Sequence, residues 1–201
     1  MENRVGIMGG TFDPIHYGHL RLALKAQEQI LLDKVLFMPS GNSYMKQNVL
    51  ETQKRVEMVA LAIEEYPQFE LSLIEVQKLG NTYTFETLHD LTKSNPDLRY
   101  YFIIGADSLF QIEHWKCPEQ IFQSATLVCA VRDEYDLGAI QRKGTALSEL
   151  GADILYLNTP KWDISSTDIR AKVKHGKPIY DLVPPKVAHY IEQEHLYYEE
   201  D

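Results

Sequence analysis

Residues 5–20 read VGIMGGTFDPIHYGHL, and this stretch decides how the chain starts to fold. Its first four residues are small or apolar, as in a short buried strand, and Gly9-Gly10 then mark a tight turn. From Gly18 to about Leu32, apolar residues recur at helical spacing with charged residues between them. We therefore expect a strand, a glycine-containing loop and a helix at the start of the chain.

Strands and helices continue to alternate along the sequence. Apolar runs predict strands at residues 35–38, 69–73, 100–104, 125–131 and 154–157. Helical spacing and helix-entry signals predict helices at residues 52–66, 85–92, 108–115 and from Pro118 onward. Such alternation specifies a parallel sheet covered by helices on both faces, with right-handed crossovers. The predicted class is α/β with a doubly wound parallel sheet, in which ligands bind outside the carboxyl ends of the strands.

The length and composition predict the domain organisation. The 201 residues suit a single domain, 1–201, and are enough to bury a core without disulfides or metals. With 44% hydrophobic and 24% charged residues, the composition excludes disordered and fibrous proteins. A closing helix is predicted from Pro184-Pro185 through Tyr197. Residues from about 164 to 201 are therefore expected to form a small C-terminal helical portion.

Charge and hydropathy argue against several classes of partner. A net charge of -9 argues against broad binding of nucleic acid, although a small phosphate pocket remains compatible with it. No apolar run approaches the roughly 18 residues needed to span a bilayer, and the N-terminus lacks the pattern of a signal peptide. We expect a cytoplasmic protein that binds neither nucleic acid nor membrane. A homo-oligomer is compatible with the sequence.

The loop after the first strand has the features of a phosphate site. Gly9 and Gly10 let backbone amides approach a ligand, Pro14 stiffens the loop, and the N-terminus of the following helix points at the same space. His16 and His19 are three residues apart, so both rings lie on one face of the first helical turn and can donate hydrogen bonds to phosphate oxygens. Neither histidine needs to act as a base.

Other types of site are less consistent with this loop. Two histidines at this spacing alone are more often a surface pair or a satisfied buried histidine than a functional site. A zinc protease would place its histidines at i and i+4 around a glutamate, and no third ligand is arranged here. The loop lacks the Gly-Lys-Ser/Thr of a P-loop and the GxGxxG of a dinucleotide-binding dehydrogenase. Phosphate binding by some other type of loop is the remaining hypothesis.

A second polar cluster, ISSTDIR, occupies residues 164–170. Its three consecutive hydroxyl residues favour the start of a helix, and the spacing of Ile169 and Val173 predicts that this helix ends before Gly176. A capped helix is the simplest interpretation. Arg170, about one turn inside, can also reach back over the free amides to bind an anion.

Together, GGTFDPIHYGHL and ISSTDIR resemble the nucleotidyltransferase superfamily that carries an HxGH motif. The length of the chain and the order of its motifs are similar to those of the bacterial nicotinate mononucleotide adenylyltransferases. This resemblance implies a Rossmann-like nucleotidyltransferase fold and a catalytic set of His16, His19 and Arg170, with both histidines on the ATP phosphates. The other ATP-binding residues that it implies are Gly9, Gly10, Thr11 and Phe12 in the cleft, Gly105 and Asp107 facing adenine and ribose, and Ser166 and Thr167 at the β- and γ-phosphates.

The same resemblance implies where the second substrate binds. Lys46, Tyr83, Thr84, Trp115 and Arg132 match the family's places around the mononucleotide. Trp115 can stack on a pyridine ring, the two cations can neutralise charge, and backbone amides at Tyr83 and Thr84 can bind a carboxylate. A core tryptophan and solvated cations are the simpler alternatives. Two departures from the family pattern affect this pocket: Lys116 replaces a common aromatic residue, and Asp133-Glu134 follow the arginine.

The activity implied by the resemblance is adenylyl transfer from ATP to nicotinate mononucleotide, giving nicotinate adenine dinucleotide and pyrophosphate in NAD biosynthesis. No carboxylate cluster is dedicated to a metal, so Mg²⁺ is expected to arrive with ATP. The alternatives are a nicotinamide mononucleotide or phosphopantetheine adenylyltransferase, a cytidylyltransferase, and a nucleotide sensor without turnover. A sensor would be expected to carry damaged motifs, and both motifs are intact here.

Overall fold

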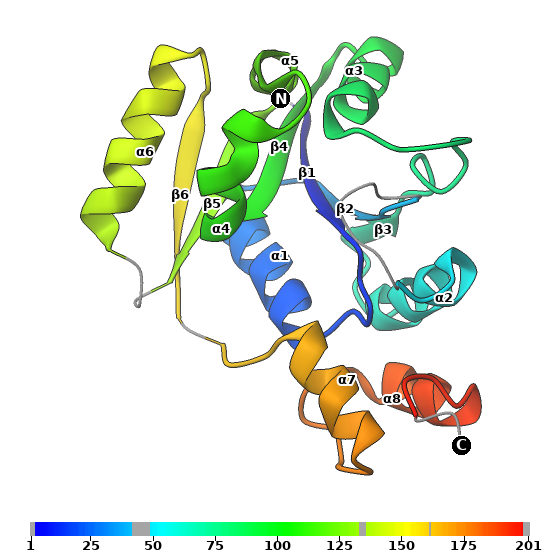
Figure 1. Ribbon diagram of the computed structural model, residues 1–201. Coiled ribbons are helices and arrows are strands. Elements are labelled where there is room, and N and C mark those ends of the chain that lie inside the picture. Colours follow the sequence, from blue (N-terminus) through cyan, green and yellow to red (C-terminus); the bar gives the residue numbers. More distant parts are fainter. Residues whose placement is uncertain (1–2, 42–48, 133–135, 161, 199–201) are drawn as a thin grey trace.

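The computed structural model describes residues 3–41, 49–132, 136–160 and 162–198 (Figure 1). The strands are β1 (Asn3–Gly10), β2 (Lys34–Pro39), β3 (Phe69–Leu71), β4 (Leu98–Gly105), β5 (Thr126–Arg132) and β6 (Ile154–Thr159). The helices are α1 (Tyr17–Ile30), α2 (Thr52–Ile63), α3 (Thr84–Ser94), α4 (Ala106–Gln111), α5 (Pro118–Ser124), α6 (Leu137–Glu149), α7 (Ser166–Lys174) and α8 (Pro185–Gln193), with a 3-10 turn at Ile112–His114.

The strands form one parallel sheet in the order β3-β2-β1-β4-β5-β6. From β1, the chain builds outward through β2 and β3, and then returns to the other side of β1 for β4, β5 and β6. The strand order therefore reverses between β1 and β4, which is where a doubly wound sheet offers its binding crevice. The predicted α/β class and doubly wound parallel sheet are confirmed.

Alternate side chains of the strands pack into two hydrophobic cores, one on each face of the sheet. In β4, Tyr100, Phe102 and Ile104 pack on one face with residues of α3, α4, α5 and α6. Tyr101 and Ile103 point to the opposite face and pack with residues of α1, α2, α7 and α8. This period of two is what a strand buried on both faces requires. Figure 1 shows the sheet between its helices.

Helix α6 is an element that the sequence pattern did not predict. Its buried positions are Ile140, Gly144 and Leu147, so a glycine stands in the middle of the apolar face. Glycine lowers helix propensity by about 1 kcal/mol relative to alanine and obscures the pattern. The structure explains the residue, because a Cβ at Gly144 would lie 1.7 Å from the hydroxyl oxygen of Tyr156. Close packing of α6 on β6 therefore depends on this glycine.

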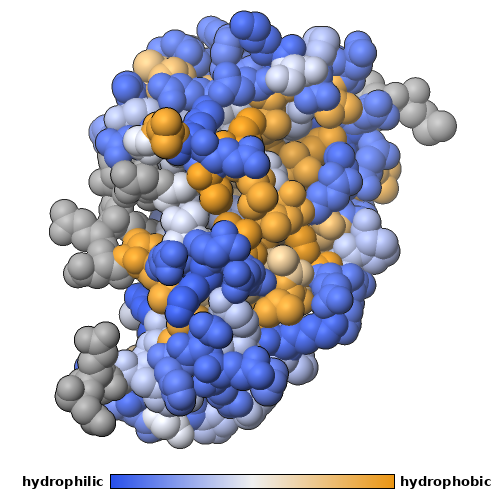
Figure 2. Space-filling model, turned by 90° about the vertical axis from the view of Figure 1, so that its right-hand side faces the viewer, coloured by the Kyte–Doolittle hydropathy of each residue, from blue (hydrophilic) through white to orange (hydrophobic). Residues whose placement is uncertain are grey.

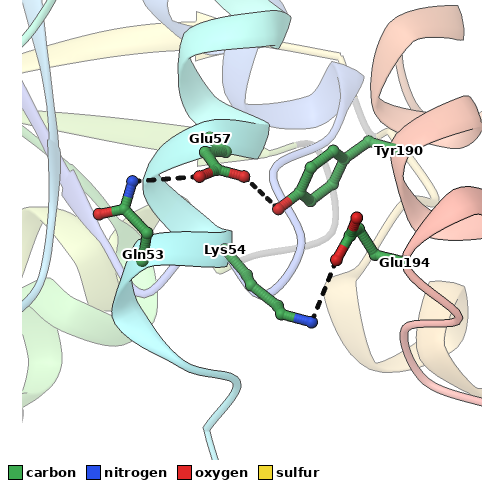
Figure 3. A network of polar contacts seen from close by, with 5 residues as sticks. All are labelled: Gln53, Lys54, Glu57, Tyr190 and Glu194. Atoms are coloured by element: carbon green, nitrogen blue, oxygen red, sulfur yellow. Dashed lines mark hydrogen bonds and ion pairs between the residues drawn. The ribbon is translucent and has the colours of Figure 1, made fainter.

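The C-terminal helices lie beyond the sheet, at the end where β1 turns into α1 (Figure 1). Helix α8 ends at Gln193, four residues before the predicted end at Tyr197, and packs against α2. Figure 3 shows the polar contacts between the two helices: Tyr190 donates to Glu57, and Lys54 pairs with Glu194 at 3.4 Å. These contacts attach the C-terminal helical portion to the first half of the chain.

The surface on the side of α2 and α3 carries a band of hydrophobic residues between two hydrophilic regions (Figure 2). Hydrophobic side chains thus reach the surface along this side of the sheet, whose edge strand is β3. Among the residues that the structure describes, no helix combines the length and the apolar character needed to cross a membrane.

Candidate active site

A cavity of about 600 Å³ opens at the carboxyl ends of the central strands. Its walls come from the β1–α1 loop, the end of β2, the starts of α3 and α7, and the segment after α4. The predicted site residues that line it are Gly9, Gly10, Thr11, Phe12, His19, Tyr83, Thr84, Trp115, Ser166, Thr167 and Arg170. Residues far apart in the sequence are therefore brought together around one space, at the reversal of strand order.

Other predicted site residues stand apart from these walls. His16 lies behind His19 and is 7% exposed. Gly105 and Asp107 are exposed at the end of β4 and in the first turn of α4, beside the cavity lining rather than in it. Lys46 lies outside the described residues, as does the side chain of Arg132, whose backbone pairs with Thr159 at the end of β5.

The two histidines form one unit at the N-terminus of α1. His16 is the N-cap, and its backbone N–H donates to Nδ1 of His19 at 3.2 Å. The two rings stack with their centroids 3.8 Å apart, which confirms the prediction that they share a face. Because Nδ1 of His19 accepts a hydrogen bond, a neutral His19 carries its proton on Nε2. A neutral His19 can therefore present an N–H donor to a phosphate and does not need a positive charge to do so.

Gly18 explains why the motif has a glycine between its histidines. A Cβ at this position would lie 2.9 Å from Nδ1 of His16, which is closer than Cβ atoms in real proteins come to other atoms. His16 is buried and stacked on His19, so its ring cannot move aside without breaking the stack. The glycine thus allows the first turn of α1 to hold both rings together.

The first turns of α7 line the end of the cavity that lies at the β1–α1 loop. Ser165 caps the helix by accepting from the N–H of Asp168 at 3.1 Å, as the run of hydroxyl residues predicted. The Ser166 hydroxyl donates to the carbonyl of Pro14 at 2.9 Å, and Nη1 of Arg170 donates to the carbonyl of Asp13 at 2.7 Å. Two helix N-termini, those of α1 and α7, therefore meet at the β1–α1 loop, and both favour anions.

The other end of the cavity combines aromatic and polar groups. Tyr83 is the N-cap of α3 and Thr84 its first residue, and both line this end of the cavity, so the N-terminus of α3 lies at the cavity wall. Trp115 packs edge-on against Phe102, with ring centroids 6.3 Å apart. The indole Nε1 of Trp115 and the hydroxyl of Ser40 are buried and have no hydrogen-bond partner among the described residues. Buried donors of this kind normally have partners, so these two atoms are exceptions in the wall of the cavity.

Lys116, a departure from the family pattern, also lines this end. Its Nζ lies 3.9 Å from the ring centroid of Tyr83 and 5.9 Å from that of Phe85. The two aromatic rings hold the ammonium group by cation–π attraction. The residue therefore adds a positive charge to the cavity in place of a further aromatic surface.

Arg55 supports the site and was not identified from the sequence. It is 2% exposed and donates to the carbonyls of Thr11 at 2.7 Å, Ser40 at 2.8 Å and Leu50 at 2.9 Å. Burial lowers the pKa of its guanidinium, and the charge of nearby Asp13 opposes that shift. An arginine on the apolar face of a predicted helix was the signal that could have revealed it.

Glu75 is a second unpredicted group in the cavity wall. Its carboxylate accepts a hydrogen bond from the Thr87 hydroxyl at 3.1 Å. Burial raises the pKa of this carboxyl, and that hydrogen bond together with nearby Lys78 offsets part of the shift. Within the described part of the chain, no three His, Cys, Asp or Glu side chains come close enough to hold a metal ion.

Comparisons with known proteins agree with this geometry. Residues 7–172 match the cytidylyltransferase-like family. A protein of Clavibacter michiganensis named "Probable nicotinate-nucleotide adenylyltransferase" is 41% identical over 96% of this chain and 94% of its own length. One of the same name from Clostridium tetani is 42% identical over 95% and 97%.

A solved structure supports the same fold. Plasmodium falciparum nicotinic acid mononucleotide adenylyltransferase, complexed with NaAD, superposes with a TM-score of 0.80 over 97% of each chain at 22% identity. The chain therefore belongs to the cytidylyltransferase-like family and, within it, to the nicotinate-nucleotide adenylyltransferases.

Proposed function

We propose that this protein transfers the adenylyl group of ATP to nicotinate mononucleotide, releasing pyrophosphate and forming nicotinate adenine dinucleotide. The observation that carries the proposal is a single cavity with two different ends. One end has the N-termini of α1 and α7 with His19 and Arg170, and suits phosphates. The other has the N-terminus of α3 beside Trp115, and suits a carboxylate on an aromatic ring.

At the phosphate end, we assign the triphosphate of ATP to His19, Ser166, Thr167 and Arg170, with His16 as the support of His19. His19 and Arg170 present donors into the cavity, whereas buried His16 holds the ring of His19 in place. The mononucleotide phosphate attacks the α-phosphorus in line, and pyrophosphate leaves on the opposite side. No protein nucleophile is required, because catalysis rests on alignment and on stabilising charge at the leaving group.

The remaining ATP contacts are assigned to backbone and to exposed groups. Gly9, Gly10, Thr11 and Phe12 line the cleft next to the triphosphate. Gly105 ends β4 and Asp107 lies in the first turn of α4, and they are assigned to adenine and ribose because Ser108, next to Asp107, lines the cavity.

At the acceptor end, we assign the pyridine ring to Trp115 and its carboxylate to the backbone amides at Tyr83 and Thr84. The charge of Lys116 on the ring of Tyr83 further favours a carboxylate over an amide. Lys46 and Arg132 remain predicted contacts of the mononucleotide, whose negative charge their side chains would neutralise. A nicotinate carboxylate interacts with the cation and amides more strongly than a neutral carboxamide does.

Pyrophosphate release tests the function. With ATP and Mg²⁺, we expect turnover with nicotinate mononucleotide to exceed that with nicotinamide mononucleotide or phosphopantetheine by at least about 10-fold, the ratio for roughly 1.4 kcal/mol. Activity only with another acceptor would overturn the acceptor assignment and keep the phosphate site. Activity with CTP in place of ATP would point to a cytidylyltransferase. No pyrophosphate release with any of the acceptors would favour a nucleotide sensor.

Mg²⁺ is proposed to enter with ATP and to be held mainly by its phosphate oxygens. When bound there, it neutralises charge on the phosphates. The described residues offer single carboxylates rather than a cluster of ligands, which fits an ion carried by the nucleotide.

Metal removal tests this proposal. Excess chelator is expected to abolish turnover while leaving the melting temperature of the nucleotide-free protein unchanged, because the ion is proposed to be held by the nucleotide and not by the described part of the chain. A melting temperature that falls on chelation would instead indicate a resident structural metal.

The expectations about partners and location stay predictions. A cytoplasmic protein with net charge -9 is expected not to bind DNA or RNA at physiological salt, which a gel-shift assay checks. Light scattering on the purified protein distinguishes a monomer from a homo-oligomer.

A further inference from the structure

Tyr197 connects the end of the chain to the phosphate-binding loop. Leu196 is 4% exposed, packs in the core and anchors the segment that follows α8. The hydroxyl of Tyr197 then donates to Oδ1 of Asp13 at 2.7 Å, across 184 positions of sequence. The contact lies between the C-terminal segment and the loop that leads into the two histidines.

The backbone of this segment is held in an unusual conformation. His195 has φ 48° and Tyr197 has φ 67°, both in the left-handed region, although neither is a glycine. Side chains with a Cβ adopt this region only at a cost in free energy, so surrounding contacts must maintain it. Burial of Leu196 and the bond to Asp13 are the contacts that do so here.

Asp13 is a junction between four parts of the molecule. It is 8% exposed, lines the cavity, and accepts from the N–H of Leu50 through Oδ2 at 3.4 Å. Its carbonyl accepts from Arg170 at 2.7 Å, and the charge of Arg55 lies close by. Asp13 therefore ties the loop to Leu50 and to the C-terminal segment through its carboxylate, and to the guanidinium assigned to ATP through its carbonyl.

The Tyr197 hydroxyl is suited to a permanent donor role. Burial raises the pKa of this phenol well above its usual value, and the negative charge of Asp13 raises it further. Arg170 and Arg55 oppose the shift but do not reverse it. The phenol thus stays protonated at neutral pH and keeps donating to Asp13.

We infer that Tyr197 is a positioning residue of the adenylyl-transfer site, which acts through Asp13 on the phosphate-binding loop and on Arg170. Tyr197 is absent from the cavity lining, so it acts without touching substrate. The inference rests on the proposed role of Arg170 at the ATP phosphates. Small displacements of a substrate-positioning group lower turnover strongly, because alignment supplies much of the catalysis in phosphoryl transfer.

Tyr197→Phe, compared with Tyr190→Phe, tests the inference. Both substitutions remove one phenol-to-carboxylate hydrogen bond from the C-terminal helical portion, but Tyr190 donates to Glu57 on α2, and neither residue lines the cavity (Figure 3). We expect similar changes in melting temperature for the two variants. Only Tyr197→Phe should lower kcat, by about 10- to 100-fold, with KM for nicotinate mononucleotide unchanged.

A double-mutant cycle identifies the route of the effect. If Tyr197 acts through Asp13, Tyr197→Phe should lower kcat little further in an Asp13→Ala background, because contacting residues are not additive. Equal effects in both backgrounds would show that Tyr197 does not work through Asp13 and would overturn the inference.

Calorimetric titration with ATP separates this inference from the proposed reaction. Tyr197→Phe is expected to raise the dissociation constant of ATP about 10-fold relative to Tyr190→Phe, a readout that needs no turnover. Equal ATP affinity and equal kcat in the two variants would overturn the inference alone. Absence of turnover in the unmodified protein would overturn the proposed reaction, while the ATP affinities would still decide whether Tyr197 positions the phosphate site.

Discussion

His19→Ala is expected to lower kcat for pyrophosphate release by about 100- to 1000-fold, the range seen when one preorganised donor is removed. His19 lines the cavity and its Nδ1 accepts from the backbone N–H of His16, so a neutral His19 carries its proton on Nε2, the nitrogen proposed to donate to the phosphates. Alanine keeps the helix and removes only the ring. Steady-state kinetics with saturating ATP and nicotinate mononucleotide measure the loss.

His89→Ala is the matched control for this experiment. His89 is an exposed residue of α3 that does not line the cavity, so its removal should leave kcat unchanged. His19→Gln should retain more activity than His19→Ala, since an amide N–H can replace the lost donor in part. Near-normal turnover of His19→Ala would refute its assignment as a catalytic residue.

Arg55→Met is expected to lower the free energy of unfolding by about 3–5 kcal/mol, as when one partner of a buried charged network is removed. The guanidinium, 2% exposed, is the donor to three backbone carbonyls from the β1–α1 loop and from the segments on either side of residues 42–48. Methionine fills similar space but supplies no donor. Urea unfolding followed by circular dichroism measures the change.

The neighbouring substitution Lys54→Met provides the control on the same helix. Lys54 pairs with Glu194 at the surface, and exposed pairs contribute at most about 1 kcal/mol. A result for Arg55→Met as small as that for Lys54→Met would show that water replaces the guanidinium and that the loops do not depend on it. Because Thr11 lies in the cavity wall, the destabilised variant should also lose turnover.

Local sequence patterns were enough to predict most of the fold. The period of two in the strands and the helical spacing between them depend on neighbouring residues, so the six strands and the doubly wound class could be predicted. The pattern failed at α6, where Gly144 interrupts the apolar face because Tyr156 packs against it. It also extended α8 to Tyr197, whereas the chain leaves the helix after Gln193.

The candidate site likewise has some contacts that the sequence predicts and others that only the structure shows. The pairing of His16 with His19 is a property of one helical turn, so the sequence by itself determined it. Other contacts of the site join residues far apart in the chain. Arg170 binds Asp13 across 157 positions, and Arg55 binds Thr11 across 44. Tyr197 binds Asp13 across 184 positions. Such contacts depend on strand order and on the path of the C-terminal segment, which no local spacing encodes, and only the tertiary structure decided them.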